Sequence, residues 1–263
     1  MKIFDSHCHL NDKAYAKDTA EVIRRANAAS VEAMMIVGIT ESTCTQAIDI
    51  AAAYPGCYAA VGIHPHDATS CNENVLRRLT DLAADPRVKA WGETGLDFNR
   101  MYSPQADQEK WFIRQLETAS TLDLPLIFHE RDSDGRFLDI LTAHFSETGC
   151  SGVVHCFSGS KTELEAYLKL GLHIGITGIA TIASRGRDLR KLLPHIPKDR
   201  ILVETDAPYL TPAPEKNKTR RNEPAFVRSV LLKVAEVLET DPEELAETLW
   251  NSTCRLFAVD AEN

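Results

Sequence analysis

The chain has 263 residues, of which 44% are apolar and 25% charged, ordinary values for a globular protein. Its 29 basic and 38 acidic residues give a net charge of −9, which argues against a general nucleic-acid coat or a polybasic membrane binder. A local basic site is compatible with that charge. The length fits one (β/α)8 barrel, which takes about 250 residues, or two smaller domains.

The seven cysteines are odd in number and none lies in a C-x-x-C pair. The sequence therefore predicts reduced thiols rather than a disulfide framework or a zinc knuckle. No apolar run reaches the roughly 18 residues of a membrane span, and no signal-peptide pattern follows Met1. We expect a soluble, monomeric, cytoplasmic protein without membrane contact.

Short apolar stretches alternate with helix-length segments along the chain. The strand candidates are KIFDSHCHL (2–10), AMMIVGI (33–39), YAAVGIHPH (58–66), VKAWGE (88–93), PLIFHE (125–130), GVVHCF (152–157), LHIGITG (172–178) and ILVETD (201–206). This alternation is typical of an α/β protein with a parallel sheet. Eight units without a break in composition predict a single-domain (β/α)8 TIM barrel over residues 1–263. The alternative is an open, doubly wound sheet.

Two helices carry clear signals at their N-terminal ends. Ser103 and Pro104 are predicted as the N-cap and first residue of one helix, and Asp241 as the N-cap of the last. The apolar faces of these helices are Phe112, Leu116 and Ala119 in the first, and Leu245, Leu249 and Trp250 in the last. Residues 211–226, rich in proline and charge, are expected to form a loop after the eighth strand.

Metal-type side chains fall at the ends of five strand candidates. His7 and His9 project to one side of the first strand, because side chains alternate, while Cys8 points away. The other candidates, each at or just beyond a C-terminal strand end, are Glu93, His129, His155 and Asp206. In a (β/α)8 barrel these ends form one rim, where the side chains converge.

Imidazoles and carboxylates together suit Zn²⁺ or Mn²⁺, and a carboxylate-rich site that keeps waters also serves Mg²⁺. Two such ions about 3.5–4 Å apart would stabilise the entering and leaving oxygens of a hydrolysis, with Glu93 as a bridge. We therefore predict a binuclear hydrolase. A lone histidine at a strand end is more often structural, but that explanation would require several independent coincidences here.

Some neighbours of these candidates are expected to support them. Asp5 and Glu204 lie one step deeper, which predicts hydrogen bonds to ligands rather than direct ligation. Cys8 and Cys156 are expected to pack in the core. His64 and His66 repeat the H-x-H spacing. The sequence allows two roles for this pair, a contact to substrate or ligands and a structural turn.

A basic run follows Asp206 on the predicted rim. The sequence allows two roles for it, a phosphate-binding site and a solvated loop. Its members are Lys216, Lys218, Arg220 and Arg221, with Arg131 and Arg136 as candidates to extend it.

Six motifs, FDSHCHL, GIHPHD, GETGLDF, HCFSG, ETDAPYL and RRNEP, occur in this order. With them the chain resembles the TatD family of metal-dependent deoxyribonucleases, from Phe4 to the C-terminal NSTCRLF. The resemblance implies an amidohydrolase-type (β/α)8 barrel with two divalent metal ions. It also implies hydrolysis of phosphodiesters, often by removal of nucleotides from a 3′ end.

The resemblance also implies site residues. One ion would be held by His7, His9, Glu93 and Asp206, and the other by Glu93, His129 and His155. The substrate rim would include Arg221, Asn222 and Glu223. The first H-x-H can be missing in the subtype that this chain most resembles, so His7 and His9 are expected to be less essential than the second set.

The predicted substrate is single-stranded DNA, with RNA as a further substrate and a role in DNA repair or degradation. Asp206 is expected to accept the proton of the attacking water, and Glu93 to bridge the ions. Substrate contacts are predicted at His66, Arg131, Arg221 and Asn222, and bases would stack on Phe98, Tyr102 or Phe157 unless these belong to the core. The alternatives are an amidohydrolase or lactonase acting on a small molecule, and a binding protein without turnover.

Overall fold

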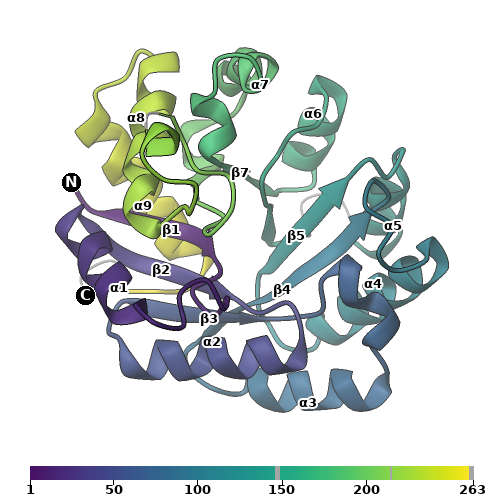
Figure 1. Ribbon diagram of the computed structural model, residues 1–263. Coiled ribbons are helices and arrows are strands. Elements are labelled where there is room, and N and C mark those ends of the chain that lie inside the picture. The colour runs from purple at the N-terminus through teal and green to yellow at the C-terminus, as the bar shows by residue number, and fades with distance from the viewer. Residues whose placement is uncertain (146–148, 214, 261–263) are drawn as a thin grey trace.

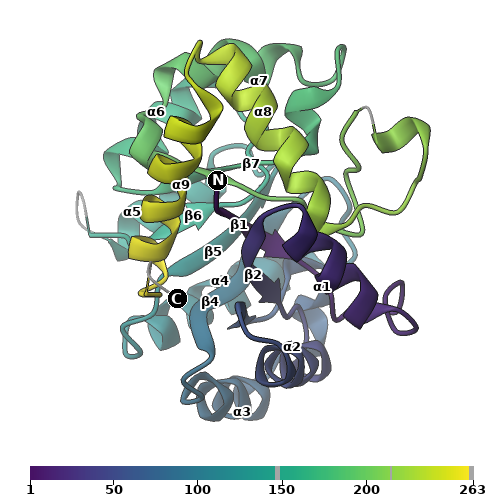
Figure 2. The same ribbon diagram turned by 90° about the vertical axis from the view of Figure 1, so that its left-hand side faces the viewer.

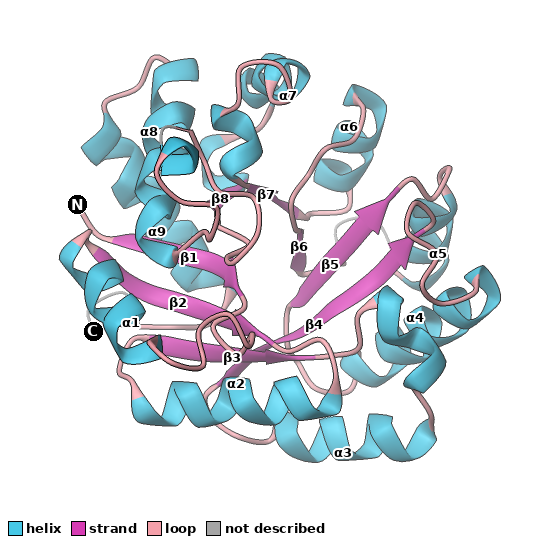
Figure 3. Ribbon diagram, in the orientation of Figure 1, coloured by secondary structure: helices cyan, strands magenta, loops and turns pink. Residues whose placement is uncertain are grey.

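The computed structural model describes residues 1–145, 149–213 and 215–260. Parallel strands form one sheet in chain order, and they are β1 (Ile3–Cys8), β2 (Val31–Val37), β3 (Cys57–Val61), β4 (Val88–Asp97), β5 (Leu126–Arg131), β6 (Gly152–Val154), β7 (His173–Ile176) and β8 (Ile201–Val203). The helices surround this sheet (Figures 1 and 3), and they are α1 (Thr19–Ala28), α2 (Glu41–Ala53), α3 (Glu73–Ala83), α4 (Gln105–Ala119), α5 (Arg136–His144), α6 (Lys161–Lys169), α7 (Arg187–Leu192), α8 (Val227–Val237) and α9 (Pro242–Leu256). Among the residues that the structure describes, no helix is long and apolar enough to cross a membrane.

The two ends of the sheet meet where β1 passes the segment after β8. The backbone N–H of Asp206 donates to the carbonyl of His7 at 2.9 Å, and the N–H of His9 donates to the carbonyl of Ala207 at 2.8 Å. Cys8 and Ala207 form a parallel bridge between these bonds. The predicted (β/α)8 barrel is therefore confirmed, and the doubly wound sheet, in which β1 and β8 would lie apart, is wrong.

Apolar side chains pack in two layers. The larger cluster lies between the strands and the surrounding helices. The smaller cluster joins inward residues of the strands, such as Phe4 and Ile127, to Trp250 and Phe257 at the C-terminal helix. The ring of Phe4 lies 6.1 Å from that of Trp250 and 5.9 Å from that of Phe257. Helix α9 therefore covers the barrel near the start of β1 (Figure 2).

Among the strand ends that differ from the predicted ones are those of β4 and β3. Strand β4 runs past Glu93 to Asp97, because Gly95 to Asp97 pair with β5 after a register shift between Gly92 and Thr94. Strand β3 ends at Val61 instead of including His66, and a short 3₁₀ helix, Pro65–Ser70, follows. Proline has no N–H for the sheet, so the chain turns there.

The two predicted helix starts have different outcomes. Asp241 caps α9 as predicted, because its carboxylate accepts hydrogen bonds from the N–H groups of Glu243 and Glu244. Ser103 does not cap α4, whose cap position is Pro104. The Ser103 hydroxyl instead donates to the carbonyl of His66 at 2.8 Å, so it fastens the β4–α4 connection to the neighbouring loop.

Candidate metal centre

The ligands predicted from the sequence converge at the C-terminal end of the barrel. They are His7, His9, Glu93, His129, His155 and Asp206. Glu93 lies in their middle and is only 2% exposed. The register shift in β4 falls at this residue, and its carboxylate lies near His7 of β1 and His129 of β5.

The two oxygens of Glu93 face different groups of histidines. Oε2 lies 3.4 Å from Nε2 of His7 and 3.9 Å from Nε2 of His9. Oε1 lies 2.9 Å from Nδ1 of His129 and 3.5 Å from Nε2 of His64. A carboxylate that bridges two ions presents its oxygens to separate ligand groups in this way.

The first group consists of His7, His9 and Asp206, whose ligand atoms all lie within 4.8 Å of one another. Oδ1 of Asp206 lies 3.4 Å from Nε2 of His9 and 3.8 Å from Nε2 of His155. The ring of His155 stacks on that of His7 with centroids 3.6 Å apart. His155 thus lies beside the first group, although its Nε2 is also 4.0 Å from Oε1 of Glu93.

The second group consists of His64, Glu93 and His129. Nε2 of His64 lies 3.2 Å from Nδ1 of His129. The H-x-H spacing was the sequence signal for His64, and the structure brings this histidine to the centre. His66 lies one step outward and turns toward Asp97.

The charges at the centre fit divalent cations. Burial alone would raise the pKa values of Glu93 and Asp206, but the adjacent histidines hold both below their ordinary values. These ionised carboxylates, Glu93 buried and Asp206 partly buried, require positive charge nearby. Imidazole nitrogens and carboxylate oxygens are the donors that Zn²⁺, Mn²⁺ and similar ions take in proteins. The donor set therefore fits divalent metal ions.

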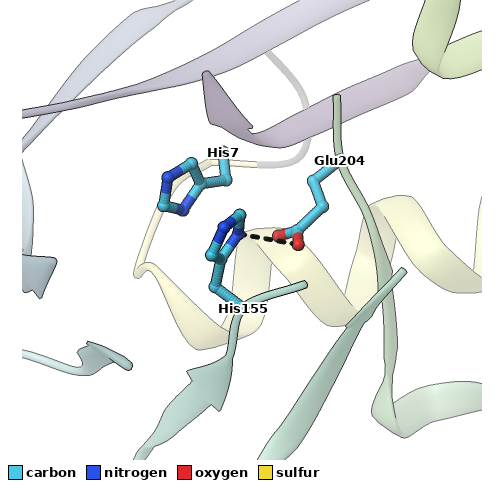
Figure 4. Close-up of side chains that lie close together, drawn as sticks. All are labelled: His7, His155 and Glu204. Atoms are coloured by element: carbon cyan, nitrogen blue, oxygen red, sulfur yellow. Dashed lines mark ion pairs between the residues drawn. The ribbon is translucent and has the colours of Figure 1, made fainter. Parts of the chain in front are cut away.

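Glu204 lies beside His155 and pairs with its ring (Figure 4). Oε1 of Glu204 forms an ion pair with Nδ1 of His155 at 2.8 Å and accepts a hydrogen bond from the N–H of Cys156 at 2.6 Å. Burial would lower the pKa of His155, but the Glu204 carboxylate raises it to about 10. This arrangement agrees with the supporting role predicted for Glu204, because Nε2 of His155 is left facing Asp206.

Asp97 holds the second group in the same manner and was not identified from the sequence. Its Oδ2 lies 2.7 Å from Nε2 of His66 and 3.2 Å from Nε2 of His129. Burial would raise its pKa, but the hydrogen bonds from His129 and His66 lower it below the ordinary value. The available signal was its even spacing from Glu93, which places both carboxylates on one side of a strand that runs further than predicted.

We expect Asp97→Asn to lower kcat/KM or metal affinity by about 10- to 100-fold, the usual cost of losing a partner behind a metal-ligating histidine. An amide offers a single acceptor oxygen and no negative charge to the two imidazoles. Steady-state kinetics and metal titration measure the effect. Asn99→Ala is the matched control, since Asn99 is an exposed neighbour whose side chain donates a hydrogen bond to Asp132. Unchanged kinetics and metal affinity in Asp97→Asn would contradict this role.

Two cavities of about 570 and 550 Å³ open over the centre. The first extends toward the start of α6 and the second toward the β3 and β4 ends. Arg131 and Arg185 line both, and His66 lines the second. Arg131 and His66, both predicted substrate contacts, therefore lie in the groove that leads to the centre.

Arg221 and Asn222, the other predicted contacts, hold the loop 211–226 in place. The Arg221 guanidinium pairs with Asp18 at 2.7 Å and with Glu223 at 2.9 Å. Asn222 is fully buried, and its amide donates to the carbonyls of Thr205 and Tyr209 at 2.9 and 2.6 Å. Neither is among the described residues that line the cavities. The guanidinium is paired with carboxylates and the amide is used inside the fold, and contact of these two residues with substrate stays a prediction.

Other candidates also have structural partners. Arg136 pairs with Glu109 at 2.8 Å. Phe157 is 3% exposed and belongs to the core, and Phe98 is partly buried against it. Of the predicted aromatic contacts, Tyr102 is the one that lines a cavity.

We expect Asn222→Ala to lower the free energy of unfolding by about 2 kcal/mol, because two buried carbonyls lose their donor. Urea unfolding measures this change. Arg220→Ala, at the exposed position two residues earlier, is the control and is expected to unfold like the parent. If Asn222→Ala instead weakened DNA binding at unchanged stability, the structural role would be wrong.

The chain matches the family model described as TatD related DNase over residues 4–258. It is 42% identical over 262 residues to a Rahnella sp. protein named 3'-5' ssDNA/RNA exonuclease TatD, covering 98% of this chain and 99% of that protein. A Yersinia pseudotuberculosis protein of the same name is also 42% identical, over 260 residues, covering 98% of this chain and all of that protein. The crystal structure of a TatD homologue from Escherichia coli is similar with a TM-score of 0.89 and 28% identity over 98% of both chains. The chain therefore belongs to the family of TatD-related DNases.

Proposed function

We propose that this chain is a divalent-metal-dependent 3′→5′ exonuclease that hydrolyses phosphodiester bonds of single-stranded DNA, with RNA as a further substrate. The observation that carries the proposal is the placement of Glu93, whose two oxygens face separate groups of imidazoles. The names of the Rahnella and Yersinia relatives support nucleic acid as the substrate.

We assign one ion to His7, His9, Asp206 and Glu93, and the other to Glu93, His129 and His155. The proximity of His64 to Oε1 of Glu93 supports it as a further donor for the second ion. Bound ions would neutralise the phosphate and lower the pKa of the attacking water. Mg²⁺ is proposed as the working ion, with Mn²⁺ or Zn²⁺ as substitutes.

Asp206 is the proposed acceptor of the proton from the water that attacks phosphorus. Its side chain is 15% exposed, against 3% for Glu93, so it is the centre's carboxylate with more access to the groove. Burial would raise the pKa of Asp206, but the hydrogen bond from His9 lowers it, so this carboxylate is in the ionised form that can accept a proton. Water adds to phosphorus, one P–O ester bond breaks, and the departing oxygen takes up a proton.

Arg131 is the proposed phosphate contact in the groove. Its side chain is 42% exposed, and the carboxylate paired with it, Asp132, lies at 4.0 Å, which leaves most of the guanidinium available. His66 stands on the same side through its bond to Asp97. We further propose that the enzyme acts as a cytoplasmic monomer in DNA repair or degradation.

The test uses single-stranded DNA labelled at its 5′ or its 3′ end, with Mg²⁺, with Mn²⁺, or with chelator. The 5′-labelled strand is expected to shorten stepwise with metal and to stay intact with chelator or with Asp206→Ala. Asp81→Ala, the same change at an exposed position on α3, is the matched control and is expected to cleave like the parent. No cleavage with any metal would refute the function, and shortening from the 5′ end would refute the polarity.

A further inference from the structure

The second cavity over the centre carries two exposed aromatic rings that the proposed chemistry does not use. Among the described residues, the large apolar side chains that stay exposed are Met101, Tyr102, Tyr209 and Leu232. Tyr102 is 66% and Tyr209 is 53% exposed, and both line this cavity. The first cavity has no tyrosine among its described lining residues. The exposed rings are therefore concentrated on one side of the centre.

Tyr102 is held in a defined position by the loop that follows β4. Its ring meets the ring of His66 edge to face, with centroids 4.7 Å apart and planes at 77°. His66 is fixed by its bond to Asp97. The next residue, Ser103, is buried and hydrogen bonded to the carbonyl of His66, so the backbone beside Tyr102 is anchored as well.

Tyr209 is held by the loop that follows β8. Its N–H donates to the carbonyl of Asp206 at 2.8 Å, and its carbonyl accepts from the buried amide of Asn222 at 2.6 Å. Its ring lies 6.2 Å from the ring of His9 at an angle of 67°. Tyr209 therefore abuts His9 of the first group, and Tyr102 abuts His66, which lies outside the second group and shares the Asp97 carboxylate with His129.

Single exposed apolar side chains are common on proteins and need no explanation. Two fixed rings that line one cavity, each beside a histidine in or next to the same centre, suit a flat ligand with accessible faces. A nucleobase has such faces when it is unpaired and unstacked. Stacking on aromatic side chains is tolerant of base identity. Arg131 and Arg185, which line both cavities, supply positive charge where the phosphates of the same strand would pass.

We infer that Tyr102 and Tyr209 form a base-stacking subsite that takes an unpaired nucleobase next to the bond to be cleaved. The inference rests on the proposed nuclease function and names the part of the substrate that this cavity binds. It accounts for selection of single strands, because a base inside a duplex keeps both faces stacked. It also predicts little preference among the four bases.

The test compares a normal single-stranded oligonucleotide with one of the same length whose 3′-terminal nucleotides are abasic. Both contain the same phosphodiester, so a difference in kcat/KM reports contacts to bases. The variants are Tyr102→Leu, Tyr209→Leu and their combination, with Tyr102→Phe and Tyr209→Phe as conservative partners. Leu232→Ala, an exposed apolar position on α8, is the control, and thermal unfolding checks that each variant folds.

The parent is expected to cleave the normal strand about tenfold more efficiently than the abasic strand, mainly through KM. In the leucine variants, kcat/KM on the normal strand is expected to fall to the value on the abasic strand, while kcat/KM on the abasic strand stays unchanged. The phenylalanine variants and Leu232→Ala are expected to keep the difference between the two strands. Equal losses on both strands, or no loss, would overturn the stacking role. Failure of the parent on both strands with every metal would instead refute the nuclease function.

Discussion

Glu93→Gln is expected to lower kcat/KM on single-stranded DNA by on the order of 10³-fold or more. Loss of a partner behind one metal ligand already costs about 10- to 100-fold, and Glu93 faces both ligand groups directly. A neutral amide has one acceptor oxygen and cannot bridge two cations. We therefore expect this variant also to retain less than two equivalents of metal after dialysis.

The matched control for this prediction is Glu165→Gln, an identical change at an exposed pair with Lys161 on α6. It is expected to keep the rate and the metal content of the parent. Circular dichroism checks that Glu93→Gln remains folded. A folded Glu93→Gln enzyme with two bound ions and the rate of the parent would contradict the bridging role.

The second large effect is expected in the double variant His7→Ala/His9→Ala, whose metal content should fall from two equivalents to one. The histidines removed belong to the group that faces Oε2 of Glu93, while the imidazoles near Oε1 remain. We expect kcat/KM to fall by about 10- to 100-fold and to stay above that of Glu93→Gln. Elemental analysis and steady-state kinetics measure the two quantities.

Cys8→Ala tests whether these losses are specific, because Cys8 lies between the two histidines and faces the opposite way. Its thiol is buried and bonds the carbonyl of Met35. This control is expected to retain both ions. Two ions in the folded double variant would show that His7 and His9 are structural. Loss of both ions would show that the two ligand groups do not bind separately.

Much of the fold could be predicted because the local pattern coincides with the tertiary one. Each of the eight strands lies in or overlaps a predicted apolar stretch, and they pair in chain order. The alternation along β1 correctly predicts that His7 and His9 face the centre and that Cys8 packs away from it. The resemblance to the TatD family is likewise confirmed by the match over residues 4–258.

The errors have a common physical origin in contacts between distant segments. The true length of β4 depends on pairing with β5, and the hydroxyl of Ser103 is used by His66, 37 residues away in the chain. The ion pair between Arg221 and Asp18, which lies just before α1, likewise joins segments far apart in the chain. Asp97 contacts His129 only because the fold places strands β4 and β5 side by side. Local patterns contain no information about such partners.

The most direct test of the central claim, a two-ion centre bridged by Glu93, is anomalous diffraction from crystals of the protein soaked in Mn²⁺. We predict two peaks about 3.5–4 Å apart on either side of the Glu93 carboxylate. One should lie within ligand distance of His7, His9 and Asp206, and the other within ligand distance of His129. A single peak, or two peaks that leave Glu93 uncoordinated, would contradict this account.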